Sequence, residues 1–455
     1  MPTASPAPPP EPAMTLVSRR AIPFAYGDRP GPAVSSGPEW LLALRERAHA
    51  RYREQGLPST KVEDWKFTNL QPLARLNLTP APPLPLDRAR LGAVLPAGLS
   101  GPRLVLGNGR RLTELDDPAG LDAGIEILSW ADAVAAAPDA LRDSLDRAVA
   151  GGQPLDALNA AYAEDGLLIR IREEHKAEAP LHIVHLGSSG DEQAAVAFHP
   201  RLLVLVEAGA RATIIESHIG LGGGTYWAQP VTDIVLGEGA VLRHVKLQEE
   251  GVGAVHTGLV KVTIGARASF DGFTLSLGGR IGRSEVRAVF AGEEGTCLLN
   301  GVYLGRDRQH MDMTTDIDHA VPRCRSREVF KGVLDDAGRG VFLGRIVVRP
   351  GAQGTDGHQL SRVLLLSDAA ESDTKPMLEI FADDVKCSHG AAVGALDADA
   401  LHYLRARGIG ETEARRLLIE AFAGEAIDLI AEEPVRDHIR ARVAAWLDRA
   451  EGVAA

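Results

Sequence analysis

Apolar runs typical of β-strands dominate the chain from about residue 166 onward. Four of these runs carry a Gly-Ala dipeptide, beginning at Gly209, Gly239, Gly265 and Gly351. The first three glycines are 30 and 26 residues apart, which is close to the periods at which a solenoid is considered. No helical pattern separates the strands, so a sheet built of βαβ units fits poorly. The pattern predicts a parallel β-helix whose stacked coils fill their interior with aliphatic ladders.

Helical patterns flank this β region on both sides. Before it, Trp40, Leu44 and Ala48 share one stripe of a helix predicted over about 39–55. After it, helices are predicted over 397–405, over 411–430 and from Pro434 onward, either as a small bundle or as a docking surface for a partner helix. The predicted apolar face of the second tail helix comprises Ala414, Leu417, Leu418, Ala421, Phe422 and Ile427.

Changes in composition divide the chain into four segments. They are a Pro- and Ala-rich disordered arm (1–37), a mixed, largely helical N-terminal domain (38–165), the β-helix core (166–395) and a C-terminal helical domain (396–455). In the second segment, Thr60 and Glu63 have the spacing of a capping box. Trp65, just after them, is predicted to anchor this turn to the fold by burial.

Charge and cysteine usage narrow the function. The net charge of −12 disfavours nucleic acid and anionic membranes as partners. Three scattered cysteines form no disulfide framework and fit a reducing compartment. The N-terminal sequence lacks the apolar core of a secretory signal, and no apolar run is long enough to cross a membrane. The composition therefore predicts a cytoplasmic protein.

An acidic strand, HMDMTTDIDH at residues 310–319, offers one candidate for chemistry. Alternation places Asp312, Asp316 and Asp318 on one face, with Met311 and Met313 on the other, which should face the core. Clustered carboxylates on a β-helix could perform acid–base chemistry on a polysaccharide. The competing interpretation is a solvated or interface face.

A second candidate is the run LEIFADDVKCSHGAAVG, which begins as a strand and ends where the helical tail follows. Cys387 and His389 are two residues apart, so a strand would project both side chains from one face. A thiol and an imidazole placed together can share a metal ion or cluster. The plain alternative is a small buried cysteine beside a surface or hydrogen-bonded histidine. No phosphate-binding loop, G-x-S-x-G, H-E-x-x-H or C-x-x-C motif occurs.

The same run, LEIFADDVKCSHGAAVGALD, together with RGIGETEARRLLIEAF, resembles the C-terminal signature of the SufB/SufD family of iron–sulfur cluster assembly proteins. SREVFKGVLDDAGRGVFLGRIVVRPGAQGTDGHQLSRVLLLS is similar to the family core, and GLPSTKVEDWKFTNL resembles the branch that is paralogous to SufB. The resemblance covers about 39–422. It implies a mainly β fold, a right-handed parallel β-helix flanked by helical domains.

The resemblance also implies partners and a site. It implies a non-catalytic scaffold subunit, in a complex with SufB through the β-helix and with two copies of the ATPase SufC. SufC would dock on the C-terminal helices at about 397–430 and hold the nucleotide. A transient iron–sulfur cluster, shared with SufB, would meet this chain chiefly at His389, with Cys387 beside it. A homodimer could form without SufB. The alternative from the residues alone is a β-helix carbohydrate-active enzyme using Asp312, Asp316 and Asp318.

Overall fold

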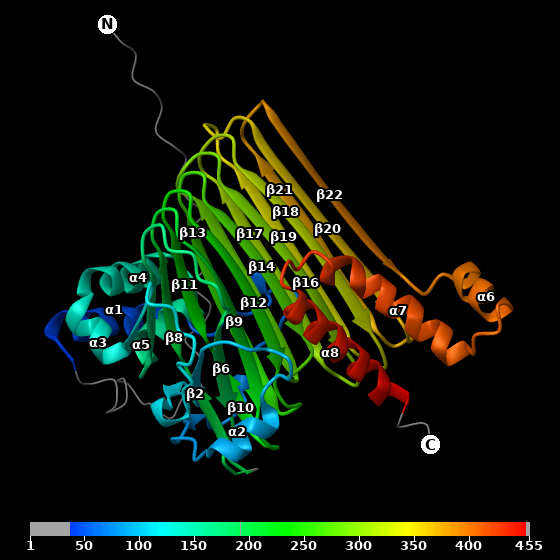
Figure 1. The fold of residues 1–455 in the computed structure, drawn as a ribbon, viewed down its shortest axis with the longest axis horizontal. Helices are drawn as coiled ribbons and strands as arrows, with labels where there is room; N and C mark the ends of the chain where they lie inside the picture. Colours follow the sequence, from blue (N-terminus) through cyan, green and yellow to red (C-terminus); the bar gives the residue numbers. More distant parts are fainter. Residues whose placement is uncertain (1–36, 192, 452–455) are drawn as a thin grey trace, which may run out of the picture.

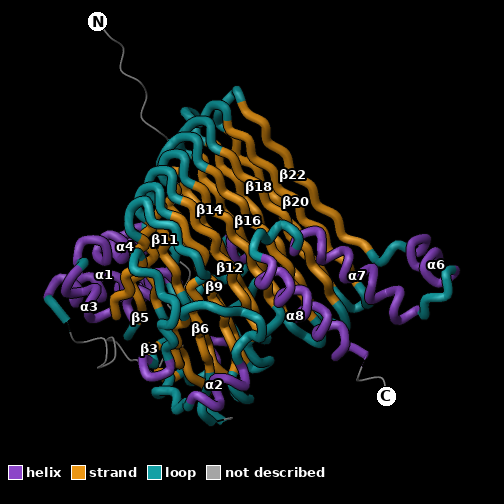
Figure 2. Tube along the Cα trace, viewed as in Figure 1, coloured by secondary structure: helices purple, strands orange, loops and turns teal. Residues whose placement is uncertain are grey.

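The computed structural model describes residues 37–191 and 193–451. All of the predicted disordered arm except Gly37 lies outside the described residues. Figure 1 shows an elongated stack of strands with helices on its flanks, and Figure 2 shows the strands of successive coils lying side by side. This arrangement confirms the predicted mainly β fold, a parallel β-helix with helices before and after it.

Two sheets form the solenoid, and from β11 onward the strands alternate between them. One sheet contains, in spatial order, β21 (Glu371–Ile380), β19 (Arg339–Val348), β17 (His310–His319), β15 (Ile281–Phe290), β13 (Ala254–Ile264), β11 (Val231–Leu236), β8 (Arg201–Val206), β5 (Gly166–Ile171) and β4 (Ile125–Ser129), with the short β1 (Thr79–Pro80), β7 (Ala195–Phe198) and β10 (Thr225–Ala228) beside this path. The other contains β22 (Val385–Gly394), β20 (Thr355–Leu365), β18 (Arg325–Leu334), β16 (Thr296–Gly305), β14 (Ser269–Ser276), β12 (Val241–Glu249), β9 (Arg211–Gly220), β6 (Leu181–Gly187), β2 (Arg103–Gly107) and β3 (Arg110–Arg111).

The coils repeat in register, which gives the interior its ladders. Ser269 pairs with Thr296, 27 residues later, and Arg325 pairs with Asp356, 31 residues later. Side chains alternate between the interior and the outer faces, as parallel strands covered on both sides require. The interior ladders form one large apolar cluster that includes Ile183, Ile214, Leu242, Phe270, Leu299 and Phe330.

The turns between coils agree only in part with the repeat that was predicted from the Gly-Ala pairs. Gly209 and Gly239 do occupy equivalent positions, both with positive φ, before the buried Ala210 and Ala240. In the next coil the equivalent residue is Arg267, with φ of 56°, rather than Gly265. An arginine fills this position although its Cβ makes the left-handed backbone costly. The sequence pattern took Gly265 as the equivalent of Gly239, which shifted the predicted repeat by two residues at this coil.

Helices of the N-terminal region pack against the first coils. The helical elements here are α1 (Glu39–Gln55), η2 (Glu63–Trp65), η3 (Leu73–Arg75), α2 (Arg88–Val94), η4 (Thr113–Leu115), α3 (Trp130–Ala136), α4 (Pro138–Ala150) and α5 (Pro154–Tyr162). α1 spans the predicted residues and buries Leu41, Leu44 and Ala48. Arg201, fully buried on β8, donates hydrogen bonds to Asp156 of α5 at 3.1 Å and to Asp233 of β11 at 2.5 Å. These bonds tie the helices to the sheet.

The segment around η2 crosses the outside of the larger sheet and covers β15 and β17. Trp65 is buried, as predicted, and the Arg283 guanidinium lies 4.0 Å from its ring centroid. Thr68 donates a hydrogen bond to Asp312. The predicted capping box does not form, because the residue before η2 is Val62 and no side chain caps it.

Three C-terminal helices follow β22: α6 (Ala398–Ala406), α7 (Glu411–Ile427) and α8 (Glu433–Glu451). α7 and α8 lie across the outer face of the smaller sheet, whereas α6 projects beyond it (Figure 1). The residues that pack against this sheet include Ile419, Ala423, Ile427, Val435, Ile439, Val443 and Trp446. The predicted apolar face of α7 was therefore partly wrong: Ala414 and Ile427 are buried, but Leu417 is 38% exposed.

Candidate functional site

The last coil of the solenoid leaves one end of the β-helix uncovered by the described residues. β21 and β22 each pair with only one neighbouring strand, β19 and β20 respectively. Ile380, Phe381 and Val393 at this end are 40%, 60% and 46% exposed. An exposed edge with unpaired main-chain groups and apolar side chains is a ready surface for another chain.

Cys387 and His389 lie on the strand that forms this edge. β22 pairs Cys387 with Gly357 and His389 with Gln359 of β20. Gly357 and Gln359 are interior positions, so both Cys387 and His389 face the interior side of the open end. The structure thus places the two predicted ligands on one face, with Cys387 half-buried and His389 exposed.

The environment of Cys387 affects its chemistry. Its Sγ lies 3.7 Å from the place where a Cβ on Gly357 would stand, so the absence of a side chain there leaves room beside the thiol. Burial raises the pKa of the Cys387 thiol above its ordinary value. A thiolate ligand at neutral pH would therefore require iron or another positive charge close to the sulfur.

The other two cysteines lie deeper in the solenoid. Cys297 and Cys324 are completely buried, and burial raises the pKa of both thiols. Cys297 is paired in register with Ser326, Ser326 with Gly357, and Gly357 with Cys387, so Cys297 lies three coils below the open edge. Neither cysteine lies on the strand that carries Cys387, so the described residues bring no second thiol to that strand.

A second imidazole at the open end was missed from the sequence. His358 lies on β20, with Nδ1 2.6 Å from Ser388 Oγ and Nε2 2.7 Å from Asp356 Oδ1. Alternation places it on the outer face, opposite to His389. Only the register of β20 against β22 brings His358 close to the strand that carries Cys387 and His389, so no local motif could have identified it.

The outer face of the acidic strand β17 is not open to solvent along its whole length. Met311 and Met313 enter the core as predicted, but Asp312 on the opposite face is fully buried beneath Thr68. Arg283 donates to Asp312 at 2.5 Å, and Thr314 donates to it at 2.8 Å. The interpretation of this face as solvated or as an interface did not foresee that a segment from the far N-terminal side of the same chain buries Asp312.

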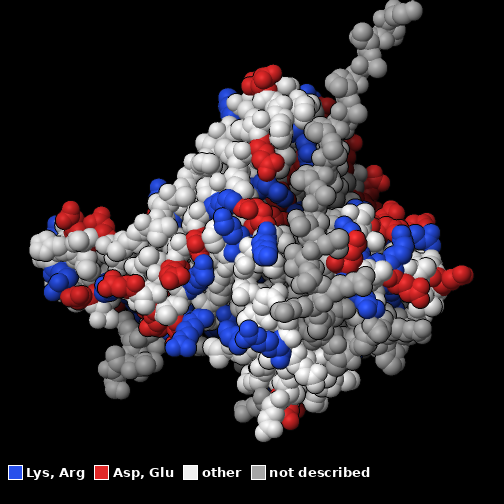
Figure 3. Space-filling view, turned by 180° about the vertical axis from the view of Figure 1, so that it is seen from behind, with Lys and Arg blue, Asp and Glu red and all other residues white. Residues whose placement is uncertain are grey.

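The remaining two carboxylates of that strand are also matched by guanidinium groups. Asp316 accepts from Arg287 at 2.9 Å and from Arg345 at 2.6 Å, and Asp318 accepts from Arg349 at 2.9 Å. Figure 3 shows basic and acidic side chains lying next to one another over much of the visible face. Each of the three carboxylates is held in an ion pair, and one of them is buried. They do not form the pair of a general acid and a general base that flanks a sugar.

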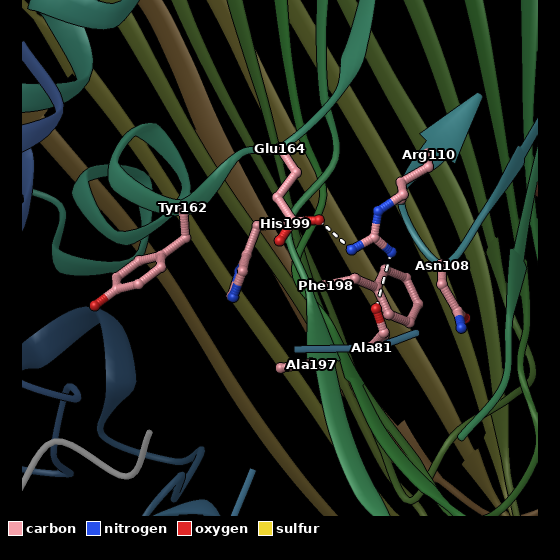
Figure 4. A pocket seen from close by; sticks show the side chains of 9 residues that line it. Ala81, Asn108, Arg110, Tyr162, Glu164, Ala197, Phe198 and His199 are labelled. Atoms are coloured by element: carbon pink, nitrogen blue, oxygen red, sulfur yellow. Dashed lines mark hydrogen bonds and ion pairs between the residues drawn. The ribbon is translucent and has the colours of Figure 1, made fainter. Parts of the chain in front are cut away.

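A small pocket lies near the start of the solenoid, among Ala81, Asn108, Gly109, Arg110, Tyr162, Glu164, Ala197, Phe198 and His199. Arg110 bridges it, paired with Glu164 and donating to the Ala81 carbonyl at 2.8 Å (Figure 4). The one guanidinium that reaches into it is thus already bound by a carboxylate. The pocket offers structural contacts rather than a second candidate for catalysis.

The fold and the candidate site together describe a parallel β-helix whose open end carries a thiol and an imidazole. Residues 187–422 match the family described as SUF system FeS cluster assembly, SufBD core domain, and residues 34–183 match the SufBD protein N-terminal region. The chain belongs to the SufBD family of the SUF system for iron–sulfur cluster assembly.

Individual relatives cover most of the chain. An iron–sulfur cluster assembly SufBD family protein of Synechocystis is 31% identical over 90% of this chain and 92% of its own length. The iron–sulfur cluster assembly protein SufD of Escherichia coli is 32% identical over 85% of this chain and 89% of its own length. The chloroplastic protein ABCI7 of Arabidopsis thaliana is 35% identical over 63% of this chain and 62% of its own length. Among residues 37–191 and 193–451, no helix is long and apolar enough to span a membrane.

Proposed function

We propose that this chain is a non-catalytic scaffold subunit that helps to assemble a nascent iron–sulfur cluster at its open end, against a SufB partner. The observation that carries the proposal is the placement of Cys387 and His389 on the interior-facing side of the exposed strand β22. A thiol and an imidazole are established ligand types for iron–sulfur clusters. Two such donors cannot complete four-ligand coordination, so a partner must supply the others.

The edge of the last coil supports the partner's position. β21 and β22 present unpaired main-chain groups along two strands, next to the exposed Ile380, Phe381 and Val393. Another β-helix could continue both sheets from this edge and enclose the two donors between the chains. A second copy of this chain could occupy the same edge when SufB is absent.

The C-terminal helices support docking of an ATPase, SufC. α6 has no buried residue, and Tyr403 on it is 58% exposed. Leu417 of α7 is 38% exposed, on the side that does not pack against the sheet. These side chains give α6 and α7 an apolar surface in addition to the one that α7 uses for its own fold. The absence of a phosphate-binding loop in the sequence agrees with a nucleotide site on the partner.

Co-expression tests the proposal as a whole. This chain should co-purify with SufB and SufC, and the complex should contain iron and acid-labile sulfide that depend on His389. The chain purified alone should hydrolyse no ATP. Hydrolysis by a preparation free of SufC, or a failure to associate with SufB, would contradict the proposal.

A further inference from the structure

A group of histidines and carboxylates lies inside the solenoid near its first coils, far along the stack from β22. Its centre is Glu216 of β9, with His185 of β6 and His218 of β9, all of them at most 5% exposed. One ligand atom from each lies within 4.8 Å of the others. His185 and His218 are paired directly across β6 and β9, and their rings stack with centroids 4.4 Å apart.

Three of the four ring nitrogens of His185 and His218 lack a hydrogen bond within the described residues. His185 Nε2 lies 3.4 Å from Glu216 Oε2, and His218 Nε2 lies 3.6 Å from the same oxygen. Both separations exceed the range of N–H···O hydrogen bonds, which is about 2.7–3.2 Å. His185 Nδ1, His185 Nε2 and His218 Nε2 have no hydrogen-bond partner among the described residues. Buried polar atoms without a partner are costly, and such a cost calls for an explanation.

The same separations suit a bound ion. A tetrahedral ion with bonds of about 2.0–2.1 Å to nitrogen and oxygen has ligand atoms about 3.3–3.4 Å apart. The nitrogen-to-oxygen distances at Glu216 are close to this edge length. The two rings are nearly parallel, so the nitrogen lone pairs of both cannot point at one ion. Binding would therefore rotate one imidazole about χ2 to direct its lone pair at the ion.

Neighbouring residues hold the carboxylate in a ligand-ready orientation. Glu216 Oε1 lies 2.8 Å from His244 Nε2 and accepts a hydrogen bond from Thr232 at 2.9 Å. Oε2 is thereby left facing the two imidazoles. Hydrogen bonds to the second oxygen of a ligating carboxylate are the usual means of fixing such a ligand.

Two buried carboxylates, Glu216 and Glu250, lie inside the solenoid at this place. The buried ammonium group of Lys246, which is paired in register with Glu216, offsets part of their negative charge. His256 lies 2.8 Å from Glu250 and 4.8 Å, between ring centroids, from His218.

We propose that His185, Glu216 and His218 form a structural site for a divalent transition-metal ion, of which Zn²⁺ is the first probe. Two imidazoles and one carboxylate are a donor set that binds zinc or ferrous iron. Because the ligands are buried, the ion enters while the coils fold rather than through an open channel. It joins β6 to β9 from the inside and is separate from the donors on β22.

Metal analysis of the full-length chain, purified without a polyhistidine tag, tests this site. Cells grown with added zinc should yield one divalent ion per chain, which dialysis against a chelator removes slowly. Glu216→Gln, which keeps the side-chain volume, and His218→Ala should each lower the metal content by about tenfold or more. His182→Ala is the matched control, since His182 is a buried histidine of β6 that instead contacts Ser217 Oγ at 2.8 Å.

A second measurement keeps the test decisive if a variant fails to fold. The wild-type chain, unfolded with a chelator and refolded with Co²⁺, should show the visible absorption of tetrahedral cobalt, and Zn²⁺ should suppress it. His358→Ala, on the outer face at the open end, should leave both readouts unchanged. A wild-type chain that retains no metal after either treatment, or a Glu216→Gln chain that retains all of it, would overturn the proposal.

Discussion

Glu328 is paired in register with Gln359 inside the solenoid, and Gln359 is paired in turn with His389 on the open strand. Glu328 is 1% exposed, and no arginine or lysine among the described residues forms an ion pair with it. Burial raises the pKa of Glu328 to about 8, opposed only in part by the nearby Thr315 and Gln359. A protonated acid thus lies two coils below the proposed cluster site.

The stability of the fold should therefore depend on pH through Glu328. Its pKa is higher in the folded state than the ordinary 4.5, so the folded chain binds the extra proton between about pH 4.5 and 8. This contribution is fully present below pH 4.5 and is lost as the pH rises through about 8. Glu328→Gln should remove this loss, worth about 1.4 kcal/mol per pH unit in that window. Urea unfolding of the wild-type and Glu328→Gln chains from pH 5 to 9 measures how the free energy of unfolding changes with pH. The same pH dependence in both chains would contradict the prediction.

Asp312 and Asp318 should differ sharply in their contribution to stability. Asp312→Ala leaves the buried Arg283 guanidinium without this partner and should cost about 3–5 kcal/mol. Asp318→Ala breaks an ion pair in which Arg349 is 54% exposed, and should cost less than about 1 kcal/mol. Chemical denaturation compares the two matched variants. A small loss for Asp312→Ala would show that Thr68 and its segment do not seal that face.

The C-terminal helices should separate into a structural part and a docking part. Ending the chain before α7 uncovers the apolar outer face of β16 and β18, so the truncated chain should aggregate or unfold. The sequence pattern of α7 did not reveal this, because both of its sides carry apolar residues and only packing selects the side with Ile419 and Ala423.

A surface substitution tests docking without removing that packing. Tyr403→Asp on α6 should weaken SufC binding by about tenfold or more, because it places a charge in an apolar contact, while circular dichroism stays unchanged. Val252→Asp is the control, since Val252 is 73% exposed on a distant turn. Equal binding by the two variants would place the SufC site elsewhere.

The sequence predicted those features that depend on local pattern. Alternation correctly placed Met311 and Met313 inside, and helical spacing correctly gave α1 its bounds. The burial of Asp312 could not be predicted, because its cover, Thr68, lies 244 residues away. The group at Glu216 was missed in part for the same reason. His218 lies two residues from Glu216 on β9, but His185 meets them only through the register of β6 and β9. Local patterns determine the face of a strand, whereas long-range contacts determine what lies opposite that face.

The two donors on β22 should not contribute equally. Cys387→Ser should lower the iron content of the complex less than His389→Ala does, because burial raises the pKa of the half-buried thiol whereas the imidazole is exposed at the open end. Neither change should cost more than about 1–2 kcal/mol of stability, since neither removes much buried surface. Iron content of the two co-purified complexes compares them, and a larger loss for Cys387→Ser would reverse the assignment.

The most direct test of the account is the iron and acid-labile sulfide bound per complex when His389→Ala is co-purified with SufB and SufC. His358→Ala serves as the matched control, because His358 is a histidine at the same open end on the opposite face of the sheet. The account predicts an intact complex that has lost most of its iron and sulfide with His389→Ala, and an intact complex with wild-type content for the control. Full iron and sulfide in the His389→Ala complex would contradict it.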